Sequence, residues 1–86
     1  MNNDIMEKVW VLHSGCIYEG GGLGRLFKTY EKAREAALVE VAKENKWRED
    51  ANAGEGDYDF RLYTETEPNY WTTEIDYITI FEKEVL

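Results

Sequence analysis

Two residues of this 86-residue chain have the types and spacing that nucleophilic catalysis needs. His13 and Cys16 lie three positions apart and could act as a base and a thiol nucleophile. Such a pair works when a third group orients the imidazole ring, and the neighbouring sequence supplies none, although Asn69 or Asp76 could approach it in the folded chain. One cysteine and one histidine are also too few for a zinc site without carboxylate ligands. We therefore predict structural roles for both residues, and no catalytic residue.

The stretch Gly20–Gly24 contains four glycines and could cradle a phosphate. Phosphate loops run from a strand through glycines into a helix, whose N-terminal amides bind the phosphate. Here the apolar run Arg25–Lys28 comes between the glycines and the expected helix, and no Gly-Lys-Ser or Gly-Lys-Thr follows. The stretch therefore predicts a hairpin turn. Binding of a small ligand or a nucleotide signal by this hairpin, with Arg25 and Lys28 as charge partners, is an alternative function.

The carboxylates of the chain could hold a metal ion or act as an acid and base pair. Asp57 and Asp59 are spaced as at the start of a calcium loop, but apolar residues follow them where an EF-hand needs further ligands and a glycine. Paired catalytic carboxylates need an apolar pocket that raises one pKa, and so short a chain rarely encloses one. We predict no metal, no cofactor and no enzymatic activity.

The negative charge of the chain is concentrated in its second half. The net charge is −8; residues 1–48 hold seven acids and eight bases, whereas residues 49–86 hold eleven acids and two bases. Such a field disfavours direct binding to nucleic-acid phosphates or to an anionic membrane surface. A basic protein surface is the partner that it favours.

Aromatic residues are interleaved with these acids, and Tyr and Trp are favoured anchors in protein interfaces. Charges at the rim of an interface mainly speed and orient docking. We therefore predict a partner-binding surface of uncompensated carboxylates and bulky rings, here called the acidic surface. Its predicted residues are Asp57, Asp59, Tyr63, Glu65, Glu67, Tyr70, Trp71, Glu74 and Asp76. A solvated face that keeps the protein soluble is the alternative interpretation.

The first half of the chain predicts two strands and a helix. Lys8–Ser14 alternates β-branched and aromatic residues, and Arg25–Lys28 is the second strand. Thr29 is the expected N-cap of a helix that runs to about Trp47. Its apolar stripe contains three alanines, which let a helix lie close to a sheet. The bases near position 47 would then lie at the negative end of the helix dipole.

The second half predicts a loop and two further strands. Residues 49–56 are polar and lack periodicity, and the alternation over Asp57–Thr64 is typical of a half-buried strand. Pro68 should break that strand over Thr64–Asn69. Asp76–Glu84 is apolar on both sides, as in a central strand or one whose second face is covered. A second copy of the chain could cover it, which makes a structural or oligomer-forming protein a further alternative.

Together these elements predict one α+β domain over residues 1–86, with the order ββαββ. We expect a mostly antiparallel four-stranded sheet with one helix packed on one face. The first residues lack the basic start and apolar run of a secretion signal, and no stretch approaches the roughly 20 apolar residues of a membrane span. We therefore expect a cytoplasmic protein with a reduced thiol.

Several segments resemble small uncharacterised proteins of tailed bacteriophages. The resemblance rests on the strand Val9–Leu12, the helix start G-x-L-F-x-T-x-E-K-A over Gly24–Ala33, Trp71, and the closing strand Asp76–Val85. Leu26 and the long acidic loop depart from the usual pattern. Small acidic phage proteins frequently act on the host, some by occupying a basic site of restriction, CRISPR or other nucleic-acid-handling machinery. The resemblance therefore implies an inhibitor of a host enzyme, located in the host cytoplasm.

Overall fold

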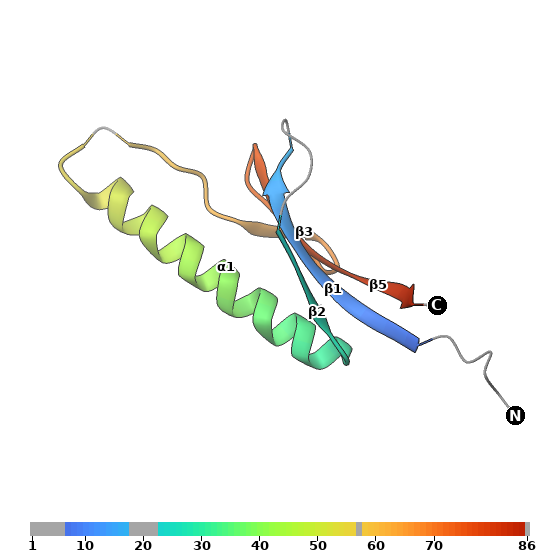
Figure 1. The fold of residues 1–86 in the computed structure, drawn as a ribbon. Helices are drawn as coiled ribbons and strands as arrows, with labels where there is room; N and C mark the ends of the chain where they lie inside the picture. The colour runs from blue at the N-terminus through green and yellow to red at the C-terminus, as the bar shows by residue number, and fades with distance from the viewer. Residues whose placement is uncertain (1–6, 18–22, 57, 86) are drawn as a thin grey trace, which may run out of the picture.

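The structure is a computed structural model that describes residues 7–17, 23–56 and 58–85. These residues form one helix and five strands, in the order β1 (Glu7–Cys16), β2 (Leu23–Phe27), α1 (Tyr30–Ala53), β3 (Thr64–Glu67), β4 (Tyr70–Thr72) and β5 (Asp76–Val85). The strands form one antiparallel sheet in the order β2-β1-β5-β4-β3, and α1 lies against one face of it (Figure 1). The α+β class is confirmed, but the sheet has five strands where four were predicted.

The sheet is built around β1 and β5, which pair over their full ten residues. β5 lies between β1 and β4, so its apolar residues on both sides belong to a central strand, which was one of the two predicted alternatives. β2 pairs with β1 in antiparallel register, as the hairpin interpretation requires. Glycines 20–22 of the predicted ligand site lie outside the described residues, whereas its charge partners Arg25 and Lys28 are described and exposed. Within the described residues no helix is both long and apolar enough to cross a membrane.

The start and the buried stripe of α1 follow the prediction. The Thr29 side chain accepts a hydrogen bond from the Lys32 amide at 3.2 Å, which caps the first turn. Ala33 and Ala37 are fully buried against the sheet, because a methyl group lets the helix backbone approach closely. The predicted end was wrong: α1 continues from Trp47 to Ala53, so the last turn contains no basic residue.

The predicted strand over Asp57–Thr64 does not form. Residues 58–63 run alongside α1 in an extended path without a strand neighbour, because two helix asparagines satisfy their backbone. Asn52 accepts from the Phe60 amide at 2.6 Å and donates to the Phe60 carbonyl at 2.9 Å. Asn45 likewise accepts from the Tyr63 amide at 2.8 Å and donates to the Tyr63 carbonyl at 3.1 Å. Tyr63, predicted to face outward, is consequently buried.

The predicted break over Thr64–Asn69 is instead the β3–β4 hairpin. Pro68 lies in its turn, where a missing amide donor breaks no ladder bond. Asn69 adopts a left-handed backbone with φ of 65°, which asparagine tolerates better than most residues. Its side-chain oxygen accepts from the Tyr30 hydroxyl at 2.9 Å and from Arg34 at 2.8 Å. Contacts with α1 therefore fix a turn that sequence patterns predict only as an interruption.

The core lies between α1 and one face of the sheet. It contains Leu12, Ala33, Ala37, Tyr63, Trp71, Ile78 and Ile80. Residues that alternate with these on the strands point to the opposite face, which no described segment covers. We call this second side of the sheet the open face; its apolar and aromatic residues are Val9, Val11, Leu26, Tyr70, Tyr77 and Phe81.

Candidate functional site

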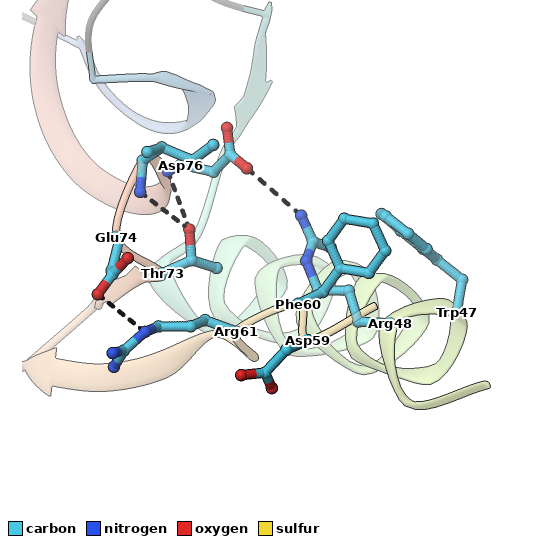
Figure 2. Close-up of a pocket in the computed structure, with 9 residues that line it drawn as sticks. Trp47, Arg48, Asp59, Phe60, Arg61, Thr73, Glu74 and Asp76 are labelled. Carbon is cyan, nitrogen blue, oxygen red and sulfur yellow. Dashed lines mark hydrogen bonds and ion pairs between the residues drawn. The ribbon is translucent and has the colours of Figure 1, made fainter. Parts of the chain in front are cut away.

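A cleft of about 350 Å³ lies beside the second half of α1 (Figure 2). There the helix runs away from the sheet (Figure 1). Three segments form it: the helix around residue 47, the extended segment 59–61, and the turn between β4 and β5. Its lining residues are Trp47, Arg48, Asp59, Phe60, Arg61, Thr73, Glu74, Ile75 and Asp76. Three of the nine residues predicted for the acidic surface, Asp59, Glu74 and Asp76, therefore meet here.

The apolar wall of the cleft is made of rings that remain open to solvent. Trp47 is 46% exposed and meets the edge of Phe60 with 5.3 Å between ring centroids. Tyr58 stacks on the Phe60 ring, also with 5.3 Å between ring centroids, and is 58% exposed. Ile75 on the β4–β5 turn is 49% exposed. Exposed rings held in place by one another are the kind of anchor that protein interfaces use.

Arg48 is the centre of the charged wall, and Figure 2 shows it reaching across the cleft to Asp76. Its guanidinium lies over the rings of Trp47 and Tyr63, at 4.6 and 4.8 Å from their centroids. It also forms ion pairs with Glu44 at 3.0 Å and with Asp76 at 3.4 Å. Arg48 is 7% exposed, so it stabilises the contact between helix and turn and neutralises Asp76.

This environment also acts on Tyr63, whose ring lies beneath Arg48. Burial, reinforced by the nearby Asp76 carboxylate, raises the pKa of the Tyr63 phenol to about 12. The phenol is therefore neutral at any physiological pH. Tyr63 belongs to the buried support of the cleft and does not present its ring at the surface.

Arg61 and Glu74 form an ion pair of 2.9 Å at the edge of the cleft. Both side chains are about two-thirds exposed, at 69% and 66%, so water screens the pair and its net stabilisation is small. A second hollow, lined by threonines of β3 and β4, begins on the far side of the same pair. The Arg61–Glu74 pair thus separates two neighbouring hollows and can be opened at low cost.

Asp59 is the carboxylate of the cleft that stays uncompensated. It is exposed, and it makes no ion pair with any residue that the structure describes. Asp59 and Phe60 are adjacent in an extended segment, so their side chains leave it on opposite sides. Both residues line the cleft, and Figure 2 shows the Asp59 carboxylate directed away from the rings of Phe60 and Trp47. The lining of the cleft therefore includes both a free acid and exposed aromatic rings.

The remaining residues predicted for the acidic surface lie elsewhere. Trp71 is 3% exposed and packs in the core beneath Arg34, 5.3 Å from its guanidinium. Glu65 on β3 pairs with Arg34 at 3.2 Å. Tyr70 is half-buried on the open face, and Glu67 is exposed at the β3 edge of the sheet. Asp57 lies outside the described residues.

Glu65 is held in its charged form by two hydrogen-bond donors. The Arg34 guanidinium, and then the backbone amide of Asn69 at 3.0 Å, lower the pKa of the Glu65 carboxyl. The same contact with Glu65 raises the pKa of Arg34. Glu65 thus anchors the β3–β4 hairpin to α1, and its charge is compensated by the helix.

His13 and Cys16, the pair considered for nucleophilic chemistry, lie on β1. The His13 ring faces Tyr77, with 3.1 Å between Nδ1 and the tyrosine hydroxyl, and Cys16 is partly buried as a free thiol. In the described part of the chain no three His, Cys, Asp or Glu residues are grouped so as to hold a metal ion.

Arg48 and Trp47 are the main site residues that sequence reasoning missed. The spacing from Glu44 to Arg48 indicates an ion pair on the helix, but Asp76 lies 28 positions away and no periodicity connects the two. The sequence predicts Trp47 as the end of the helix. The helix instead continues for six further residues, and Trp47 lines the cleft.

Comparison of the chain with protein-family models, with curated proteins and with solved structures finds no match.

Proposed function

We propose that this protein is a binding protein without catalytic function, and that its cleft receives a cationic side chain from a basic partner protein. The supporting observation is that one cleft is lined both by a carboxylate without an ion pair among the described residues, Asp59, and by the exposed rings of Trp47 and Phe60. This is a narrower site than the acidic surface predicted from the sequence, because arginines already compensate Glu65, Glu74 and Asp76.

A lysine or arginine side chain of the partner fits the chemistry of this cleft. Its aliphatic stem packs on the apolar wall, its charge lies against an aromatic face, and its nitrogen donates to the Asp59 carboxylate. A cation that approaches Glu74 competes with Arg61 for an exposed ion pair of small net stability. Opening that pair joins the two hollows into a longer groove that accommodates an extended segment.

The charge of the whole molecule supports a basic partner. At −8 the protein attracts cationic surfaces over distances of about a Debye length and repels nucleic acid. Enzymes that handle nucleic acids carry cationic sites for phosphates. The net charge and the resemblance to tailed-bacteriophage proteins together lead us to propose such a host enzyme as the partner, which the protein would inhibit by occupying its basic site.

A lysine- and arginine-rich peptide titrated into isotopically labelled protein tests the proposal by NMR. We expect the largest shifts at the Trp47 indole and at the amides of residues 59–61 and 73–75. Asp59→Lys should weaken binding by about tenfold or more, which corresponds to roughly 1.4 kcal/mol for a close charge pair turned repulsive.

Glu35→Lys is the matched control, since it makes the same charge change on the exposed face of α1, outside the cleft. Trp47→Ala tests the aromatic wall, with Val39→Ala as the control at an exposed helix position of similar character. Equal losses for Asp59→Lys and Glu35→Lys would mean that the peptide reads net charge alone, and the cleft would then not be the site.

A further inference from the structure

The open face of the sheet has the apolar character of a covered surface. Leu26, Val11 and Phe81 lie opposite one another on β2, β1 and β5 and form one cross-strand row. Leu26 is 67% exposed and Phe81 is 43% exposed. Nearby, Tyr70 and Tyr77 stack with 6.3 Å between ring centroids. Val11, between Leu26 and Phe81, is already only 8% exposed. Burying Leu26 and the aromatic rings around it is favourable, and no described segment of the chain does so.

Charge is nearly absent from the same face. The chain has 18 acids, yet the described side chains on the open face of β2, β1, β5 and β4 include no carboxylate. Lys83, opposite Val9, stands at one end of the face. Glu67, opposite Tyr70, stands at the β3 edge. Neither makes an ion pair with another described residue.

We propose that a second copy of this chain covers the open face, giving a two-fold dimer in which the two sheets pack face to face. In such a dimer the same patch contacts itself, so every contact occurs twice. A two-fold axis in the plane of the interface brings Lys83 of each copy to Glu67 of the other. The rows centred on Val11 then form the dry centre, and two ion pairs form the rim.

A second copy fits this face better than the basic partner does. Two molecules of charge −8 repel each other wherever carboxylates meet, so they can approach most closely at a surface whose described side chains include few of them. Lys83 and Glu67 make that surface complementary to itself. A cationic partner, by contrast, gains little from a face whose described side chains include only Glu67 as an acid. This proposal is independent of the cleft, whose lining residues lie on the helix side and on the β4–β5 turn.

The size of the face supports a weak association. β1 and β5 are ten residues long, but β2 and β4 have only five and three residues, so these four strands cover roughly 400–450 Å² per copy. Two copies then bury about 800–900 Å², which is below the size of stable specific interfaces and typical of weak, transient ones. We therefore expect a reversible dimer whose population depends on protein concentration.

Sedimentation equilibrium of the full chain with a charge-exchange series tests the proposal. We expect a monomer–dimer equilibrium, with the dissociation constant raised about tenfold by Lys83→Glu or by Glu67→Lys, because each change makes two rim pairs repulsive. The double variant exchanges the two charges and should return the constant to within about threefold of the original. Glu84→Lys, exposed on the helix side of β5, makes the same charge change as Glu67→Lys and is the control.

Phe81→Glu addresses the centre of the interface. Because Phe81 is already 43% exposed, the substituted monomer should keep its near-ultraviolet circular dichroism while the dimer is lost. A protein that remains monomeric at high micromolar concentration would overturn the proposal and leave the face to a different partner. A dimer that persists in Phe81→Glu, or a double variant no better than its parents, would also overturn it.

Discussion

The arginines of α1 decide what the acidic residues of the second half can do. Arg34 pairs with Glu65, and Arg48 pairs with Asp76 as well as with Glu44. Both arginines also lie over aromatic rings, Trp71 and Tyr63, which fill the core. A charge-assisted pair with a planar guanidinium fixes a carboxylate in position and removes it from the free charge of the surface. These acids therefore hold the fold together, and of the three acids that line the cleft only Asp59 makes no ion pair with a described residue.

Glu65 allows a test of this structural role through pH. Its pKa is lowered by folding, so its contribution to stability is present above the ordinary glutamate pKa of about 4.3 and is lost as the pH falls through the lower folded value. We expect Glu65→Gln to lower the melting temperature at pH 7 and to match the parent protein in strong acid. Glu35→Gln, exposed and without an ion pair among the described residues, is the control. A constant difference at all pH values would contradict the role of the charge.

At the scale of elements, the helix replaces a strand as the partner of residues 58–63. Asn45 and Asn52 are seven residues apart, about 10.5 Å along a helix, and the residues they hold, Tyr63 and Phe60, are three apart, about 10 Å along an extended chain. Each amide side chain pairs with one backbone amide and one carbonyl, as a neighbouring strand would. Because the spacing of the two asparagines along the helix equals the spacing of Phe60 and Tyr63 along the segment, both bonds form together and hold Phe60 at the cleft.

Removing either asparagine should therefore release the segment. We expect Asn45→Ala to cost about 1–2 kcal/mol of unfolding free energy, because it leaves the part-buried backbone amide and carbonyl of Tyr63 without partners. Asn52→Ala should cost less, about 0.5–1 kcal/mol, because water can replace its exposed bonds to Phe60. Amide hydrogen exchange should accelerate at Tyr63 in the first variant and at Phe60 in the second. Lys46→Ala, on the same helix with a side chain that is 77% exposed, is the control. Unchanged exchange at both amides would show that the asparagines do not hold the segment.

The molecule has two candidate contact surfaces, one negatively charged and one with little charge. The cleft at the end of α1 carries an unpaired acid in a molecule of charge −8, whereas the open face is neutral over most of its area. Salt screens attraction and repulsion alike within a distance set by the Debye length. The two proposed contacts should therefore respond to salt in opposite directions.

We expect binding of the basic peptide to weaken between about 0.05 and 0.5 M salt, whereas the dimer should strengthen over the same range. Repulsion between two molecules of charge −8 acts over their whole surfaces, and the rim pairs that oppose it contribute about 1 kcal/mol each or less. NMR titration and sedimentation at matched salt concentrations measure the two responses. If both weakened together, the open face would not be the contact between copies.

Local sequence signals determined the elements whose partners are close in the chain. Thr29 caps the helix three residues before the amide that it binds, and the alanine stripe repeats at the helical period, so both could be predicted. The alternation in β1 and β5 likewise predicted two long strands. In each case the physical cause, a hydrogen bond or a buried face, acts within a few residues.

The tertiary structure alone decided the path of residues 58–63, the β3–β4 hairpin and the state of the acids. The alternation of Tyr58, Phe60 and Leu62 suits an extended chain whether its neighbour is a strand or a helix, and nothing local marks Asn45 and Asn52 as that neighbour. Arg34 and Glu65 are 31 positions apart, and Arg48 and Asp76 are 28 apart. Charges so far apart in the sequence meet only when the chain packs. The sequence therefore gives the number of charged residues, but it does not show which acids are compensated by arginines.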